Sequence, residues 1–264
     1  RAEAGAWQVI SPEFMEVMAC ALHWSRASQG AWDPTVGPLV DAWGFGPRAN
    51  PLADHRAQLP HPQRLQAARA RVGFERLQLS PAERRVLQPG GAQLDLSGIA
   101  KGFGVDLVAR TLQRLGFGHF LVEVGGELRG QGLRPDGQPW WVDLETPPAQ
   151  SGQPPLPTTR VALHGLCVAT SGDYRRVYTH HGQRRPHTLD PRHGQPVAHG
   201  LASVSVVHTE CLWADAWSTA LTVLGLQDGL ALASAHGVAA LFVQREADGR
   251  LTETLSPAME ALAE

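Results

Sequence analysis

The hydrophobic period of this chain changes repeatedly between the spacing of helices and the spacing of strands, and this limits the fold class. Residues 11–30 begin with the helix-start pair Ser11 and Pro12 and continue with apolar side chains three to four residues apart. From Leu77 onward the period becomes two, in short runs separated by turn residues. Such hairpins, interleaved with a few helices, predict an α+β fold with antiparallel β-sheets and packed helices, and not a doubly wound parallel sheet.

The other elements follow from the same periods. Residues 31–46 contain two prolines and three glycines among apolar side chains, so we expect an irregular loop that lines a pocket or fills a core. Residues 47–63 predict an exposed loop. The expected strands are residues 77–80, 85–88, 92–97, 119–124, 127–130, 140–144, 161–163, 201–207 and, as the last of the chain, 239–244.

Four further helices are expected after the first. They span residues 60–72, 97–115, 214–224 and 230–236. We expect Ser97 to cap the second of these and Gly116 to close it. Its predicted apolar face consists of Ile99, Phe103, Val108, Leu112 and Leu115.

The composition is that of a folded globular protein. Hydrophobic residues make up 43% and charged residues 18% of the 264 residues, which excludes disordered and fibrous classes. This length suits a single domain over residues 1–264, in which the Pro- and Gly-rich segment 150–157 is the best loop between two subdomains. The formal net charge is −2 and no Lys/Arg block exceeds two residues, so we expect no nucleic-acid partner. No stretch approaches the ~20 consecutive apolar residues that cross a bilayer.

The cysteine and lysine counts bear on the chemistry. Cys20, Cys167 and Cys211 are odd in number and form no Cys-x-x-Cys pair, which favours buried thiols over a disulfide scaffold or a thiolate zinc site. Lys101 is the single lysine among 23 lysine and arginine residues. Because an ammonium is not interchangeable with a planar guanidinium, Lys101 is a candidate functional residue, with chance retention as the alternative.

Residues 94–102, LDLSGIAKG, form a candidate phosphate-binding junction between a strand and a helix. Asp95 ends the predicted strand, Ser97 begins the helix, and Lys101 follows one turn later. The free backbone N–H groups and positive dipole end of such a junction suit a phosphate. The alternative is that Asp95 and Ser97 only cap the helix and that Lys101 is solvated. The glycines do not have the G-x-G-x-x-G spacing, so we reject a Rossmann site.

A candidate metal site lies on the helix expected at 214–224. Asp215 and Thr219 are four residues apart and therefore share one face of that helix. Their hard oxygen atoms suit Mg²⁺, held together with water and substrate phosphate, better than zinc. The alternative is an ordinary helix-start charge and a threonine bonded to its own backbone.

Two further polar segments are candidates. Residues 170–175, TSGDYR, follow an apolar run and predict a polar turn. His187 stands close in sequence to Asp190 and could supply acid or base chemistry near neutral pH. A structural role is the alternative for any one of the 12 histidines.

Five segments between residues 31 and 225 form a pattern when read together. They are AWDPTVGPLVDAWGFG, LDLSGIAKGFGVD, FLVEVGGELRGQG, VATSGDYRR with the later HTLDPRHGQPV, and LASVSVVHTECLWADAWSTALTVLG. In this order and spacing they resemble the ApbE family of flavin transferases (FAD:protein FMN transferases). Each segment alone is weakly specific, but the resemblance covers most of the chain.

The resemblance implies an enzyme that binds FAD and Mg²⁺ and transfers the FMN half of FAD to a threonine hydroxyl of a target protein, releasing AMP. Carried over by motif, the resemblance implies that Ala31, Trp32 and Asp33 contact the flavin nucleotide, although the family more often has phenylalanine where Trp32 stands, and that Asp95 and Lys101 contact FAD. It implies that Mg²⁺ is held by Asp215, Thr219 and the main-chain carbonyl of Gly98. It also implies catalytic roles for Lys101 and His187.

Two other functions remain open from the sequence. One is a Mg²⁺-dependent FAD pyrophosphatase, in which water replaces the threonine, and the other is a non-catalytic FAD-binding protein. Family members usually carry roughly 50 further residues before the region matching Ala6, so the chain is similar to a member shortened at its N-terminus. They are typically exported and often lipid-anchored, which implies a periplasmic or inner-membrane-associated protein whose anchoring segment lies outside this chain.

Overall fold

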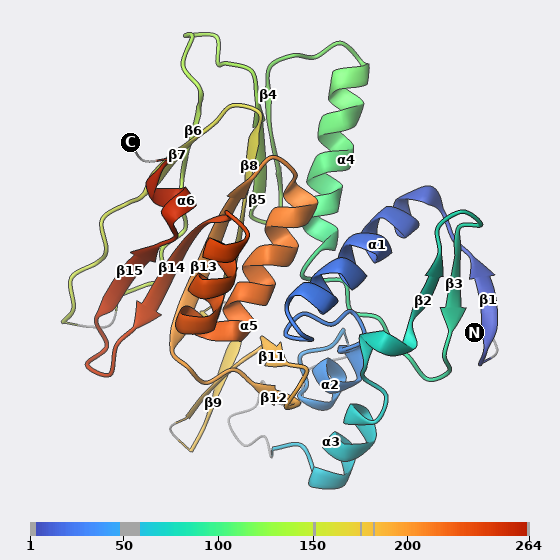
Figure 1. The fold of residues 1–264 in the computed structure, drawn as a ribbon. Helices are drawn as coiled ribbons and strands as arrows, with labels where there is room; N and C mark the ends of the chain where they lie inside the picture. Colours follow the sequence, from blue (N-terminus) through green and yellow to red (C-terminus); the bar gives the residue numbers. More distant parts are fainter. Residues whose placement is uncertain (1–3, 48–58, 150–151, 175, 182, 263–264) are drawn as a thin grey trace. The chain divides into compact units, whose positions relative to one another are not determined.

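The computed structural model describes residues 4–47, 59–149, 152–174, 176–181 and 183–262. They form two compact units. Unit 1 comprises residues 1–96 and 176–198, and unit 2 comprises residues 97–175 and 199–264. The described residues contain both helices and β-strands, and all of their strand pairs are antiparallel (Figure 1). The predicted α+β class is therefore confirmed.

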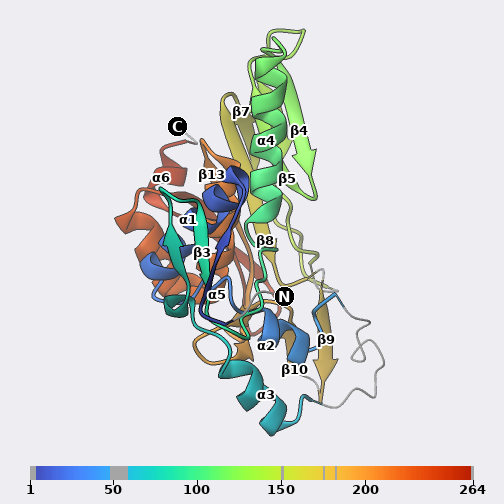
Figure 2. The same ribbon diagram turned by 90° about the vertical axis from the view of Figure 1, so that its right-hand side faces the viewer.

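Unit 2 is built on a six-stranded sheet with the order β15-β14-β13-β8-β5-β4. Its strands are β4 (Phe120–Val124), β5 (Glu127–Gln131), β8 (Leu166–Gly172), β13 (Leu201–His208), β14 (Ala239–Arg245) and β15 (Leu251–Leu255). Helix α4 (Ala100–Arg114) packs on β4 and β5, and α5 (Cys211–Ala235) packs on β8 and β13 (Figures 1 and 2). The central strand β13 is apolar along most of its length because helices and further chain cover both of its faces.

The other face of this sheet carries a second apolar cluster. The elements that take part are β6 (Trp140–Asp143), β7 (Arg160–Leu163) and α6 (Pro257–Glu260). Leu163, Val168, Leu241 and Met259 are buried together there. The predicted loop at 150–157 lies in the part of the chain assigned to unit 2, and its residues 150–151 are outside the described residues.

Helix α5 is interrupted where the sequence predicted a gap between two helices. Gly225 has φ 81° and ψ 178°, a left-handed φ that favours glycine. A Cβ at this position would lie 3.0 Å from the ring of His199. Two helical stretches therefore follow one another across a kink, close to the predicted spans 214–224 and 230–236.

The predicted N-cap of α4 was wrong, and its predicted apolar face was wrong in part, although Ile99 is fully buried. Ile99, not Ser97, is the N-cap, and its side chain makes no capping bond. The side chains of Val108 and Leu115 are 43% and 69% exposed. The buried residues of the helix are Gly102, Val105, Asp106 and Ala109. This difference arises because α4 faces α5 as well as the sheet, so small side chains are needed where the two helices touch. The helix ends before Gly116, as predicted, with φ 90° at that glycine.

The contact between α4 and α5 predicts opposite effects for two glycines of the same helix. A Cβ at Gly102 would lie 2.1 Å from the carbonyl oxygen of Cys211, whereas a Cβ at Gly104 would meet nothing within 4 Å. We expect Gly102→Ala to destabilise the protein by about 1–3 kcal/mol or more through overpacking. Gly104→Ala, the matched control, should stabilise it by about 0.5–1 kcal/mol. Denaturant unfolding of both variants measures this, and equal effects would contradict the close approach.

Unit 1 contains the first helix and a three-stranded sheet. Its elements here are α1 (Pro12–Ala27) and the antiparallel strands β1 (Ala6–Val9), β3 (Arg85–Gln88) and β2 (Gln78–Ser80), in that spatial order. The side-chain oxygen of Ser11 accepts a hydrogen bond from the backbone N–H of Phe14 at 3.1 Å, so the predicted start of α1 is confirmed. Met18 and Leu22 of α1 pack against Leu77.

A second cluster in unit 1 surrounds residues 31–46. The further elements of the unit are α2 (Gly37–Ala42), α3 (Pro62–Arg69), a 3-10 helix (Phe74–Arg76), β9 (Val177–His180), β10 (Gln183–Pro186), β11 (Leu189–Asp190) and β12 (Gln195–Pro196). Leu39, Trp43, Phe45 and Leu189 form the buried cluster. The indole N–H of Trp43 donates to the carbonyl oxygen of Gly194 at 2.9 Å.

Several predicted elements need correction. Residues 31–46 are not wholly irregular, because Pro38 fits the first turn of α2. Residues 92–97 form no strand; there the backbone N–H of Asp95 donates to Pro34 O at 2.8 Å. The predicted polar turn at 170–175 begins inside β8, and β15 follows the strand expected to be last. Most of the loop predicted at 47–63 lies outside the described residues.

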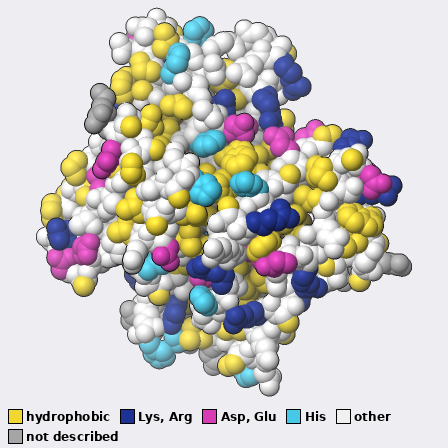
Figure 3. All heavy atoms as spheres, in the orientation of Figure 1, with side chains coloured by type: hydrophobic (Ala, Val, Ile, Leu, Met, Phe, Trp, Pro, Cys, Tyr) yellow, Lys and Arg dark blue, Asp and Glu magenta, His cyan; other side chains and the backbone are white. Residues whose placement is uncertain are grey.

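The prediction for the cysteines agrees with the structure. The three cysteines are buried thiols that form no disulfide bond. Among the described residues, every helix is too short or too polar to cross a membrane. Acidic and basic side chains are interspersed over the face shown in Figure 3, consistent with the small net charge.

Candidate functional site

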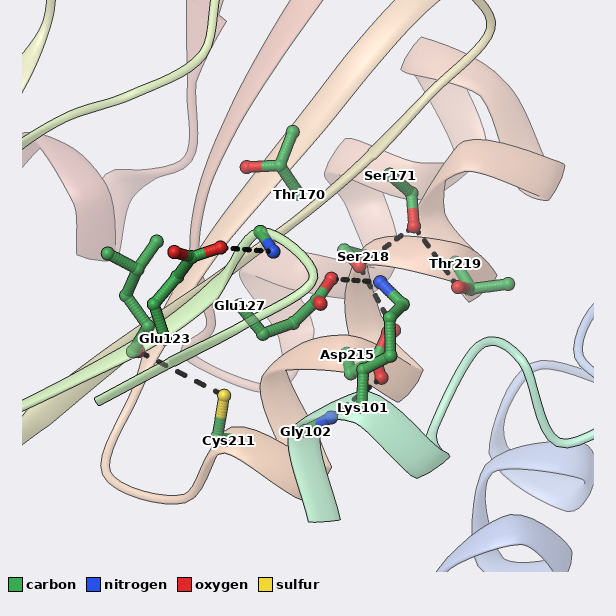
Figure 4. Close-up of polar contacts among 12 residues, drawn as sticks. Lys101, Gly102, Glu123, Glu127, Thr170, Ser171, Cys211, Asp215, Ser218 and Thr219 are labelled. Carbon is green, nitrogen blue, oxygen red and sulfur yellow. Dashed lines mark hydrogen bonds and ion pairs between the residues drawn. The ribbon is translucent and has the colours of Figure 1, made fainter. Parts of the chain in front are cut away.

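The first turn of α4, the second and third turns of α5, the start of β5 and the end of β8 converge in unit 2 (Figure 4). Lys101 comes from α4, Asp215 and Thr219 from α5, Glu127 from β5, and Ser171 from β8. The structure therefore brings together Lys101, Asp215 and Thr219, which the sequence analysis singled out, with Ser171 of the candidate segment 170–175. Glu127, which also lies here, was not singled out. Whether these residues bind Mg²⁺ and FAD remains a prediction.

Asp215 is anchored to the first turn of α4. Its Oδ2 accepts a hydrogen bond from the backbone N–H of Gly102 at 3.0 Å, and the carboxylate is almost fully buried. Burial raises the pKa of Asp215 to about 7, and the nearby charge of Glu127 acts in the same direction. The ammonium of Lys101 and the N–H groups of Lys101 and Gly102 oppose this rise in pKa without cancelling it. A buried carboxylate in this environment is stabilised in its charged form by additional positive charge.

Thr219 lies against Gly98, so the predicted proximity of α5 to this turn is present. A Cβ at Gly98 would lie 2.7 Å from Thr219 Oγ1, which shows how closely the backbone approaches the hydroxyl. Ser171 Oγ lies 3.1 Å from Thr219 Oγ1 and 3.0 Å from Ser218 Oγ. Three hydroxyl oxygens from α5 and β8 thus lie together, and that of Thr219 approaches the backbone of Gly98.

Lys101 pairs with a carboxylate that the sequence analysis missed. Its Nζ forms a short ion pair with Glu127 Oε1, and the side chain of Glu127 is only 2% exposed against 39% for Lys101. Gly125 turns the chain over the lysine stem with φ 63°, and a Cβ there would lie 3.2 Å from Lys101 Cδ. The Gly-Gly pair directly before Glu127 was the available signal, since it marks a tight turn at a strand start.

These residues fit a divalent cation held by oxygen atoms. Asp215 and Glu127 together with Lys101 carry one net negative charge when both carboxylates are ionised, and both carboxylates are buried. Within the described residues, no group of three or more His, Cys, Asp or Glu side chains forms a metal cluster. A cation here would therefore need hydroxyl and main-chain oxygens as well, which suits Mg²⁺ better than zinc.

Unit 1 holds the predicted flavin contacts. Ala31 and Trp32 are buried. Both carboxylate oxygens of Asp33 are used within the chain: Oδ1 accepts from the Thr35 hydroxyl at 2.6 Å and Oδ2 from the Phe74 N–H at 3.0 Å. Burial raises the pKa of Asp33, although these hydrogen bonds oppose it. Asp33 thus fixes the backbone of its own loop, and its flavin contact stays a prediction.

His187 lies in unit 1 at the end of β10. Its Nδ1 is 3.3 Å from the carbonyl oxygen of Arg176, and its ring stands 6.3 Å from that of Phe45. Since a carbonyl only accepts, this contact favours the tautomer with the proton on Nδ1 and the lone pair on Nε2. The carboxylate of the nearby Asp190 forms an ion pair with Arg192, at 2.8 Å from Oδ2 to Nη2. The acid or base role of His187 stays a prediction.

Comparisons with known proteins bear on this site. A family model described as the ApbE family matches residues 1–242. The FAD:protein FMN transferase of Haemophilus influenzae is 37% identical over 250 residues, covering 94% of this chain and 70% of that protein. The protein of the same name from Vibrio cholerae is 38% identical over 243 residues, covering 91% and 69%.

Solved structures give the same result. The Pseudomonas stutzeri flavinyl transferase ApbE in its apo form superposes with a TM-score of 0.86 at 40% identity, covering 99% of this chain and 78% of that one. The ApbE protein of Thermotoga maritima has a TM-score of 0.83 at 27% identity, covering 99% and 81%.

Proposed function

The chain belongs to the ApbE family and is a flavin transferase, and we propose that it transfers FMN from FAD to a threonine hydroxyl of a target protein, with Mg²⁺ bound and AMP released. The observation that supports this proposal is that Thr219 lies against Gly98 while Asp215 accepts a hydrogen bond from the N–H of Gly102, one helical turn further on. These hard oxygen donors at the start of a helix suit a cation that binds a pyrophosphate.

The chain's residues have separate roles in this proposal. Asp215, Thr219 and the carbonyl of Gly98 would hold Mg²⁺, which when bound neutralises charge on the FAD phosphates. Lys101, oriented by Glu127, stabilises negative charge that develops on the transferred and departing phosphates. Ala31, Trp32, Asp33 and Asp95 contribute to FAD binding.

His187 acts as the base in the same reaction. Its Nε2 accepts the proton of the threonine hydroxyl as the threonine oxygen bonds to the phosphorus of the FMN half. The bond between that phosphorus and the bridging oxygen breaks, and AMP leaves with the electron pair. The Nδ1 contact with the carbonyl of Arg176 orients the ring for this step.

Incubation with FAD, Mg²⁺ and a threonine-containing acceptor protein tests this function. We expect mass spectrometry to show one FMN on the acceptor for each AMP released, and no FMN on an acceptor in which valine replaces the threonine. Free FMN with AMP would instead identify a pyrophosphatase. Bound FAD without AMP release in the presence of Mg²⁺ would identify a flavin carrier.

We also propose, from the family resemblance, that the protein acts in the periplasm or at the inner membrane. An acceptor protein would then have to be exported as well. Fractionation of cells that express the full-length gene tests this, and recovery in the cytoplasm alone would contradict it.

A further inference from the structure

The two helices that carry the candidate metal site begin without a cap of their own. The N-cap residues are Ile99 for α4 and Glu210 for α5, and neither side chain bonds to its helix. The first backbone N–H groups of a helix have no partner inside the helix, and side chains commonly satisfy them. In α4 and α5, the side chains that accept hydrogen bonds from these N–H groups come from elsewhere in the chain.

Each helix receives its cap from the other. Asp215 of α5 accepts from the backbone N–H of Gly102, the third residue of α4, at 3.0 Å. Asp106 of α4 accepts from the backbone N–H of Leu212, the second residue of α5, at 2.8 Å. Because this exchange is reciprocal, moving either helix along the other breaks a hydrogen bond at both N-termini.

The two capping carboxylates differ in their counter-charge. The second oxygen of Asp106, Oδ1, accepts from Arg129 Nη1 at 2.8 Å. The same nitrogen donates to the carbonyl oxygen of Thr209 at 2.7 Å, just before α5 begins. Asp215 instead lies beside Lys101, which is already paired with Glu127. The carboxylate of Asp106 is thus neutralised by Arg129, which also bonds to the segment just before α5. The carboxylate of Asp215 is available to a cation.

We propose that Asp106, held by Arg129, is a positioning residue for the Mg²⁺ site. It fixes the start of α5 so that Asp215 and Thr219 remain against the turn at residues 98–102. Asp106 itself is not a ligand, because both of its oxygens are bonded within the chain. This inference deepens the proposed function and rests on its metal site.

The test compares Asp106→Ala with Asp106→Asn in metal-free protein titrated with Mg²⁺ by calorimetry. Alanine removes the cap of α5, and we expect the Kd for Mg²⁺ to rise by about 10-fold or more. Asparagine keeps an oxygen that accepts from the Leu212 N–H but loses the charge pair with Arg129, so its Kd should rise less than that of the alanine variant, by about threefold. Ser11→Ala removes the cap of α1 and is the matched control that should leave Mg²⁺ binding unchanged.

Amide hydrogen exchange supplies a readout without metal. The Gly102 N–H is capped by Asp215 and not by Asp106, so its exchange reports whether Asp106 positions Asp215. We expect Asp106→Ala to speed exchange at Gly102 as well as at Leu212. Unchanged exchange at Gly102, or an unchanged Kd for Mg²⁺, would overturn the inference.

Two further results separate the possible failures. If Asp106→Ala does not fold, Arg129→Gln takes its place, with a Kd expected to rise several-fold and an unchanged Kd overturning the inference. If the wild type binds no Mg²⁺, the proposed function fails, while the exchange at Gly102 still decides whether Asp106 positions Asp215.

Discussion

The Asp215→Asn variant is expected to fold normally and to lose Mg²⁺-dependent FMN transfer by about 100-fold or more. Asparagine keeps an oxygen that accepts from the Gly102 N–H, so the cap of α4 survives the change. The variant lacks the negative charge with which Asp215 would bind the cation. Initial rates of acceptor flavinylation, together with the Kd for Mg²⁺, measure the effect. Wild-type turnover in this variant would remove the metal assignment.

The same variant should change how stability depends on pH. Burial raises the pKa of Asp215 from its ordinary value of 3.8 to about 7 in the metal-free fold. Between these values the folded protein holds a proton that the unfolded chain has released. This group therefore lowers the free energy of unfolding as pH rises from about 4 to 7, by up to about 4 kcal/mol.

Asp215→Asn lacks this titration. Metal-free Asp215→Asn should therefore match the wild type near pH 4 and exceed its melting temperature at pH 8. Saturating Mg²⁺ at pH 8 should stabilise the wild type and leave the variant unchanged. Melting curves at pH 4, 6 and 8, with chelator or with Mg²⁺, measure both effects. Parallel pH profiles for the two proteins would contradict the raised pKa of Asp215.

The second large effect is expected at Lys101. Lys101→Met leaves the buried carboxylate of Glu127 without its ammonium. We expect this to cost roughly 2–3 kcal/mol of stability, below the range for fully buried pairs because Lys101 is partly exposed. Transfer should fall by about 100-fold, because a positioned cation is lost where negative charge develops. Denaturant unfolding and transfer rates measure the two losses separately.

A double variant distinguishes the two roles of Lys101. Adding Glu127→Gln to Lys101→Met removes the uncompensated buried charge, so stability should recover while transfer stays low. Lys101→Arg keeps the charge with a different geometry and should retain stability better than transfer. If the double variant regains wild-type transfer, Lys101 serves only to neutralise Glu127.

Much of the fold could be predicted because the signals are local. The start of α1 at Ser11 and Pro12, the end of α4 before Gly116 and the interruption of α5 at Gly225 depend on residues that are neighbours in sequence. Strand-like runs located β4, β5, β13 and β14 of the main sheet for the same reason, but not β8 or β15. The ordered motifs also predicted the family, which the comparisons confirmed.

Errors occurred where a distant segment supplies a partner. Residues 92–97 looked like a strand, but the N–H of Asp95 bonds to Pro34. The predicted apolar face of α4 included Val108, but the helix buries small side chains where it packs against α5. In each case a contact with a distant segment decides the arrangement.

The sequence by itself determined the α+β class, the family and the residues Lys101, Asp215 and Thr219 as candidates, because residue type, period and motif order are properties of the chain. Only the tertiary structure decided that Glu127 neutralises Lys101 and that Asp106 and Asp215 cap each other's helices. The physical reason is that a buried charge or an unsatisfied N–H takes whichever partner packing brings near, and packing joins residues more than a hundred positions apart.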